Sequence, residues 1–219
     1  MTKTITVTGT GQVSVKPDLI AISIRLETRE KEYDKTMAVA AERINALDKS
    51  LQEIGFEKKA VKTKSFNVGT NYENVKVSDG NYKRVLKEYV CVHNLAVEFD
   101  LDMKRLSCAL AAMSACLAKP EFSVSFTVKD PTAVGNELLQ VAARNAKEKA
   151  DILCAASGVR RGELLSVNYS WGETNVCSPT EYRVESRRMT KVMASAANIE
   201  IEPDDIKASD SATFVWEII

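Results

Sequence analysis

Apolar residues recur with two different periods along this chain, and each period predicts one kind of element. Over residues 131–158, apolar and small residues follow at three- and four-residue steps while charged residues take the other side, which predicts an amphipathic helix. Asp130 and Pro131 suit the beginning of that helix, and Gly158 suits its end. The apolar stripe is mostly alanine, so we expect the helix to pack very close to a sheet. The stripe consists of Leu139, Ala142, Ala143, Ala146, Ala150, Leu153 and Cys154.

Two alternating stretches begin the chain and predict a pair of strands. Apolar and polar residues alternate with a period of two over residues 4–15 and 20–26. Gly9 and Gly11 fall among the apolar positions of the first stretch, which indicates a bulge or a close approach of another backbone. Residues 16–18 suit a turn, so we expect the two strands to pair as a hairpin.

The remaining elements alternate between strands and helices. A helix is predicted from about residue 30 to residue 54, ended by Gly55, and a shorter helix follows Asp102. Residues 85–99 carry apolar side chains on both faces, which indicates a strand in the middle of a sheet. Further strands are predicted over residues 61–72, 122–128, 165–171 and 212–218, with at best an edge strand over 199–206. An exposed hairpin loop is predicted over residues 71–82, and a loop, with or without a short helix, over residues 173–198.

The order of these elements predicts the fold class. Strands and helices follow each other as ββαββαβαββ, which favours an α+β fold: one or two two-layer α/β sandwiches with mostly antiparallel sheet. We treat residues 1–219 as a single unit. An alternative division has two sub-lobes, one formed by residues 1–65 with 130–219 and the other by residues 66–129 inserted between them.

Composition and charge narrow the possible partners. The chain has 219 residues, of which 45% are hydrophobic and 27% charged, as in ordinary globular proteins. Thirty Lys and Arg balance thirty Asp and Glu, so the formal net charge is zero. We therefore expect no nucleic-acid partner and no general attraction to anionic membranes. The apolar runs are too short to cross a bilayer, so no membrane span is predicted.

The beginning of the chain and its cysteines bear on location. Met1 leads into an alternating strand pattern instead of the apolar block of a signal peptide, so the chain as written is predicted to be cytoplasmic. A periplasmic or other extracytoplasmic location applies if a native signal peptide was removed. Five cysteines without CxxC spacing are expected to be reduced thiols, most of them buried.

Few residues indicate chemistry. The GTGQ stretch at residues 9–12 is not followed by a helix or by a Lys-Ser/Thr pair, so we do not expect a phosphate loop. His93, the one histidine, lies two residues from Cys91, and we expect a hydrogen-bonded sheet histidine rather than a Cys–His nucleophile pair. One histidine without a cysteine pair predicts no metal site. We predict no catalytic residues and no cofactor.

Two groups of residues are candidates for binding. Arg183, Arg187, Arg188 and Lys191 form a basic cluster that predicts either a partner-binding patch or a solvated loop diluted by glutamates. The apolar C-terminal strand suggests assembly through the side chains of Phe214 and Trp216. With no net charge to repel other copies, we expect a homo-oligomer, and a further protein partner is possible.

Three segments resemble the SIMPL family (DUF541). VTGTGQVSVKPDLIAISI is similar to the family's first pair of strands, and AARNAKEKADILCAASGVRRGELLSVNYSW resembles its alanine-rich helix, closing glycine and following strand. IEPDDIKASDSATFVWEI resembles its closing element, although Asp205 stands where members commonly have glycine. The resemblance covers nearly the whole chain in order, and its motifs are structural.

The resemblance implies membership of a family but no particular catalytic reaction. The family includes the 26 kDa periplasmic immunogenic proteins of Gram-negative bacteria, relatives linked to oxidative stress and an animal kinase-binding protein, and it has no agreed catalytic residues. Most bacterial relatives have an export signal, and some assemble into large rings. We therefore expect a non-enzymatic binding or assembly module that self-associates, with a stress-related role. The alternative is a small-molecule-binding or redox-responsive stress protein with a site near Cys91 and His93.

Overall fold

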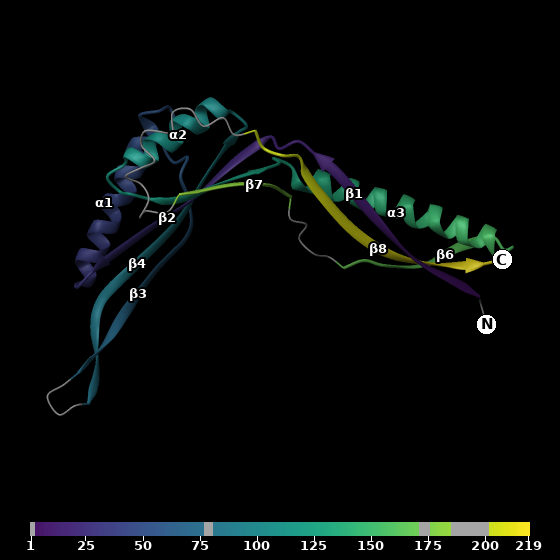
Figure 1. Ribbon diagram of the computed structural model, residues 1–219, viewed down its shortest axis with the longest axis horizontal. Helices are drawn as coiled ribbons and strands as arrows, with labels where there is room; N and C mark the ends of the chain where they lie inside the picture. Colours follow the sequence, from purple (N-terminus) through teal and green to yellow (C-terminus); the bar gives the residue numbers. More distant parts are fainter. Residues whose placement is uncertain (1–2, 77–80, 171–175, 185–201) are drawn as a thin grey trace. The chain divides into compact units, whose positions relative to one another are not determined.

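A computed structural model describes residues 3–76, 81–170, 176–184 and 202–219, and these form three helices and eight strands (Figure 1). The helices are α1 (Tyr33–Gln52), α2 (Met103–Ala115) and α3 (Pro131–Ala156). The strands are β1 (Thr4–Val15), β2 (Leu19–Glu30), β3 (Lys62–Lys76), β4 (Tyr82–Asp100), β5 (Glu121–Thr127), β6 (Arg161–Asn168), β7 (Cys177–Val184) and β8 (Ile206–Ile218). The predicted α+β class is confirmed.

The chain divides into two compact units. Unit 1 contains residues 1–18, 127–179 and 203–219, and unit 2 contains residues 19–126 and 180–202. These boundaries differ from the predicted sub-lobes, because β2, α1 and the first residues of β3 (62–65) group with β4 and not with the N-terminal strand.

Unit 1 is a three-stranded sheet in the order β1-β8-β6, with α3 packed on one face. Strand β8 pairs with both neighbours in antiparallel fashion. The predicted close helix–sheet contact is confirmed, because a Cβ atom added to Gly9 would lie 2.0 Å from the carbonyl oxygen of Ala142. The stripe residues Ala142, Ala146 and Ala150 are fully buried. The glycines allow this contact because they have no side chain to separate the two backbones.

The ends of α3 follow the sequence signals. The Asp130 carboxylate accepts a hydrogen bond from the Ala133 backbone N–H at 2.9 Å, which caps the first turn. Gly158 has a φ of 69°, and the Val159 N–H donates to the Cys154 carbonyl at 3.0 Å. This arrangement is a Schellman motif, and it explains why the helix stops where the glycine predicts.

Unit 2 is built on a five-stranded sheet in the order β3-β4-β2-β5-β7. Strand β4 pairs in antiparallel fashion with β3 on one side and β2 on the other, which confirms its predicted central position. Helices α1 and α2 contribute to one large core with β2, β4 and β5. The core contains the fully buried side chains of Leu47 from α1, Leu106 from α2 and Phe126 from β5. The helices therefore cover one face of the sheet.

Several predictions about the strands are wrong. β1 and β2 do not form a hairpin, since β1 pairs with β8 and β2 pairs with β4 in another sheet. The three residues between them connect the two units instead of making a tight turn. The C-terminal strand lies in the middle of its sheet. Of the segment predicted as at best an edge strand, residues 202–205 form no strand, Ile206 begins β8, and residues 199–201 lie outside the described residues. Strand β7 occupies a segment predicted as loop.

Candidate functional site

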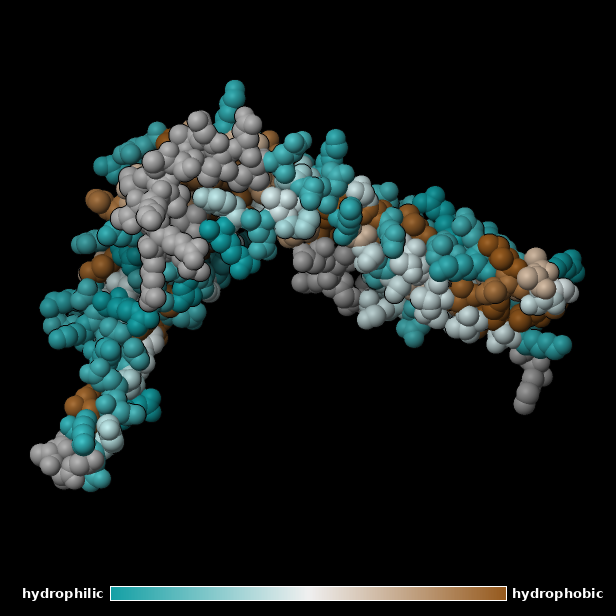
Figure 2. Space-filling view, in the orientation of Figure 1, coloured by the Kyte–Doolittle hydropathy of each residue, from teal (hydrophilic) through white to brown (hydrophobic). Residues whose placement is uncertain are grey.

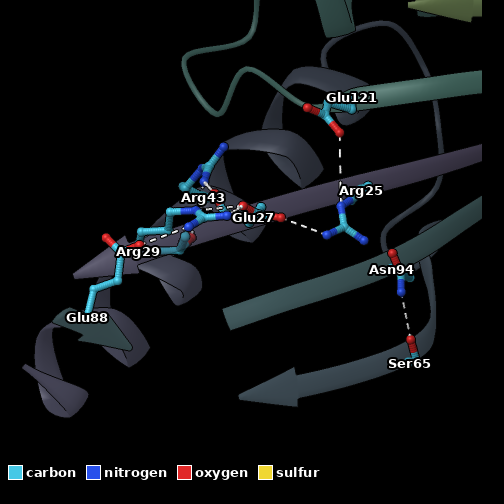
Figure 3. A network of polar contacts seen from close by, with 9 residues as sticks. Arg25, Glu27, Arg29, Arg43, Ser65, Glu88, Asn94 and Glu121 are labelled. Atoms are coloured by element: carbon cyan, nitrogen blue, oxygen red, sulfur yellow. Dashed lines mark hydrogen bonds and ion pairs between the residues drawn. The ribbon is translucent and has the colours of Figure 1, made fainter. Parts of the chain in front are cut away.

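The open face of the five-stranded sheet carries a connected network of charged side chains (Figure 3). Residues of β2 that alternate with its buried isoleucines project there. Glu27 accepts hydrogen bonds from Arg25 at 2.6 Å and from Arg29 at 2.7 Å, and Arg29 also donates to Glu88 at 2.8 Å. The bonds from Arg25 and then Arg29 lower the pKa of Glu27. Strand β2 thus holds alternating charges that neutralise one another across the face.

A shallow hollow of about 440 Å³ lies on the same face. Its lining includes three cations, each of which already has an acidic partner: Arg25 bonds to Glu27, Lys64 lies 3.4 Å from Glu98, and Arg183 lies 2.7 Å from Glu181. Such exposed ion pairs contribute little to the free energy of folding, so each cation can exchange its acidic partner for another one. The hollow can accept polar groups, but its balanced charge does not select an anion.

His93 faces away from this network, on the helix side of β4. A hydrogen bond of 2.9 Å joins its Nε2 atom to the Thr63 hydroxyl on β3, and its ring meets Phe66 edge to face. Burial lowers the His93 pKa, and the Asp48 carboxylate opposes this shift. These contacts agree with the expectation of a hydrogen-bonded sheet histidine.

Cys91 is almost completely buried beneath α1. Burial raises the pKa of its thiol, and the Arg43 guanidinium only partly offsets that effect. The thiolate is therefore disfavoured near neutral pH, which makes Cys91 a poor nucleophile. Arg43 itself donates to the carbonyl oxygens of Ala118 and Glu27, so it ties α1 to the sheet and to the loop after α2.

Of the basic residues predicted to bind a partner, one lies in the part of the chain that the structure describes. Arg183 lies on β7 and borders the hollow, while Arg187, Arg188 and Lys191 fall outside the described residues. The basic cluster remains a prediction.

The two aromatic side chains predicted for assembly lie inside unit 1. Phe214 and Trp216 stack with ring centroids 5.4 Å apart and pack with α3 in the core, 8% and 4% exposed. In this arrangement their side chains hold α3 on the sheet and are covered by their own unit. A surface for assembly would therefore have to consist of other residues.

Where the sequence predicts an exposed hairpin loop over residues 71–82, the structure has a two-stranded arm, formed by Asn71–Lys76 of β3 and Tyr82–Lys87 of β4. Figure 1 shows these parts of the ribbon extending past α1. The ladder continues through the arm from the Tyr72–Leu86 pair to the Lys76–Tyr82 pair. The sequence predicts a loop here because residues 71–82 are rich in Asn, Ser, Asp and Gly. The cross-strand pairing, not composition, reveals the strands.

The arm exposes apolar side chains to solvent. Tyr72, Val75 and Leu86 are 42–44% exposed, and Tyr82 is 70% exposed. Figure 2 shows hydrophobic atoms interrupting the hydrophilic surface near the end of the arm. A two-stranded ribbon without a covering layer has little stability of its own in water. Exposed apolar groups on such a ribbon are typical of a binding surface.

Other kinds of site find little support among the described residues. In that part of the chain no three His, Cys, Asp or Glu side chains gather as a metal site would require. No helix formed by the described residues is both long and apolar enough to cross a membrane.

Comparison with known proteins places the chain in a family. No curated protein matches the chain significantly. The profile of the SIMPL family, described as a protein of unknown function (DUF541), matches residues 5–216, from the first residues of β1 almost to the end of β8. Both units and all three resembling segments lie within or almost wholly within this match. The chain belongs to the SIMPL family.

Proposed function

We propose that this protein is a non-enzymatic binding and assembly module that self-associates through its arm. The exposed apolar side chains of the arm carry this proposal. Val75 and Tyr82 lie next to the strand ends, where α1 gives no cover (Figure 1). Burying such side chains against another copy would remove apolar surface from water at about 25 cal/mol for each Å².

Size exclusion coupled to light scattering tests self-association. The wild-type chain should have a mass above the 24.1 kDa of one copy. The double variant Val75→Ser/Tyr82→Ser should shift toward the monomer, because it removes apolar contacts without touching either core. Leu117→Ser is the matched control, since Leu117 is 92% exposed but lies in the loop after α2. A wild-type protein that stays monomeric across micromolar concentrations would reject the proposal.

The rival function is a small-molecule-binding or redox-responsive stress protein with a site near Cys91 and His93. The buried thiol and its raised pKa argue against easy oxidation. We expect all five cysteines to titrate as free thiols after denaturation without reductant, with Cys91 unreactive in the folded protein. Rapid native labelling of Cys91, or thiol chemistry lost in His93→Ala, would favour the rival.

A further inference from the structure

The arm is suited to contact another protein through both its apolar and its charged groups. Its exposed cations include Lys76 and Lys83, while Arg84 lies over the Tyr72 ring at 4.5 Å. Glu73 is engaged by Lys87 at 3.4 Å, and Glu88 at the base of the arm is engaged by Arg29. The outer arm therefore presents apolar side chains with positive charge beside them.

Unit 1 exposes a second apolar surface, at the end where α3 and β8 finish and β6 begins. Leu164 and Leu165 on β6 are each 50% exposed, and Ile219 is 65% exposed. Ile152 and Leu153 on the last turns of α3 are 67% and 51% exposed. Figure 2 shows hydrophobic atoms gathered over this end of the unit. We call these five residues the apolar end of unit 1.

The two edge strands of the three-stranded sheet differ in whether their outward backbone N–H and C=O groups are already hydrogen-bonded. Along β1, the Thr10 N–H donates to the Asn145 side chain at 3.1 Å, and Lys149 donates to the Thr8 carbonyl at 3.2 Å. Side chains of α3 thus occupy backbone groups that an added strand would need. In the described part of the chain β6 pairs only with β8, so its outer edge can accept a strand.

Charge favours contact between unlike units of two copies. Unit 1 contains nine Lys and Arg against eleven Asp and Glu, and unit 2 contains twenty-one against nineteen, so their formal net charges are −2 and +2. Glu163 on β6 and Glu217 on β8 border the apolar end, but so do Lys3 and Arg160. Charge can steer the approach only weakly, so the apolar contacts must hold the complex.

Resting on the self-association proposed above, we propose that the arm of one copy packs against the apolar end of unit 1 in a second copy. One chain carries both surfaces, both are apolar, and the units that bear them have opposite formal charge. The arm is already a strand ribbon, so it can lie along the open edge of β6 while its side chains meet Leu164 and Leu165. Each copy then has a donor surface and an acceptor surface.

Site-specific crosslinking of the full chain tests this contact. Benzoylphenylalanine in place of Tyr82 keeps an aromatic ring in the arm and reacts on illumination with whatever lies beside it. Mixing isotopically heavy and light copies identifies bonds between copies by mass spectrometry. We expect heavy–light crosslinks from position 82 to peptides containing residues 160–168 or 214–219. The same probe in place of Tyr33, 50% exposed on α1, is the control and should not label these peptides.

A second measurement uses substitutions on both surfaces. Leu164→Asp and Tyr82→Asp should each raise the dissociation constant at least tenfold, and the double variant should be little weaker than either single variant because both remove the same contact. Leu117→Asp should leave association unchanged. An oligomeric wild type whose position 82 crosslinks to another arm, to other peptides or to nothing rejects the inference alone. A monomeric wild type rejects the proposed function as well.

Discussion

The two units join helix to sheet in opposite ways. In unit 1, Gly9 and Gly11 on β1 face the backbone of α3, and an added Cβ would lie 2.0–2.1 Å from the carbonyl oxygens of Ala142 and Leu138. In unit 2, large side chains such as Leu47 and Phe126 fill the space between helices and sheet. One interface depends on the close approach of two backbones, and the other on the volume of its side chains.

Because the two interfaces differ, the two units should tolerate different substitutions. A close-packed interior loses dispersion contacts when atoms are removed and gains strain when atoms are added. Unit 1 has almost no side-chain volume to lose at its glycine–alanine contact, so additions should damage it most. Unit 2 has large side chains to lose, so truncations should damage it most. Hydrogen exchange measured on peptides of each unit can follow the two responses separately.

The largest effect is expected for a truncation in unit 2. Leu47→Ala truncates a side chain of α1 that is fully buried in the core of unit 2, and it should lower the free energy of unfolding by about 2–5 kcal/mol. Urea unfolding measures the loss, and hydrogen exchange should place it in unit 2. Leu117→Ala is the control because that side chain is 92% exposed. Equal, small losses in both variants would contradict a volume-filled core.

The next effect is expected where a side chain is added in unit 1. Gly9→Ala brings a methyl group against the helix backbone, which cannot move aside as a flexible side chain would, so the loss should reach the upper part of about 1–3 kcal/mol. Gly69→Ala makes the same change on β3, where nothing lies within 4 Å of the added atom. That control should keep wild-type stability. Similar urea midpoints for the two variants would mean that α3 does not touch β1 closely.

An enlargement on the helix side should have a somewhat smaller effect. Ala146→Leu forces three more carbon atoms into the same contact, but a leucine side chain can bend toward the edge of α3, so we expect about 1–3 kcal/mol. Ala155→Leu makes the same change at an exposed position of that helix and should be nearly neutral. Both variants can be compared by their melting temperatures. An unchanged melting temperature for Ala146→Leu would show that the alanine stripe faces solvent.

The sequence predicted the elements whose causes are local. Asp130, the alanine stripe and Gly158 defined α3 because caps and side-chain periodicity act within a few residues. The paired glycines of β1 predict a bulge or a close approach of another backbone, and α3 makes that close approach. Apolar residues on both faces of β4 indicated its central place. In each case one short segment contains the physical cause.

The pairing of strands could not be read in the same way. β1 and β8 are joined across some 200 residues, in a register that places Ile5 opposite Trp216. Nothing in either segment alone excludes the nearer partner β2. The strands of the arm could not be predicted for a related reason: Tyr72 and Val75 stand three residues apart instead of two, so only the pairing of β3 with β4 shows that both strands continue. An apolar terminal strand does not reveal which layer covers it, so the sequence predicts assembly through Phe214 and Trp216, whereas α3 covers both side chains.

The smallest expected effect concerns pH and again separates the units, because the one histidine, His93, lies in unit 2. Burial lowers its pKa in the folded state below the ordinary value of about 6.5. Below that value the unfolded chain binds the proton more readily, so stability should fall as the pH drops from about 7.5 to 5.5. Asp48, whose own pKa is raised by burial, should oppose this loss as it takes up a proton at lower pH.

His93→Gln keeps a partner for the Thr63 hydroxyl but cannot titrate, so the acid-dependent loss in unit 2 should become smaller than in the wild type. Asp48→Asn should enlarge the loss, because it removes the carboxylate that raises the His93 pKa. Unit 1 contains no histidine, and its exchange protection should change little over this range. Urea unfolding at the two pH values, with hydrogen exchange for each unit, measures all three effects. An equal loss in the wild type and in His93→Gln would assign the pH dependence to other groups.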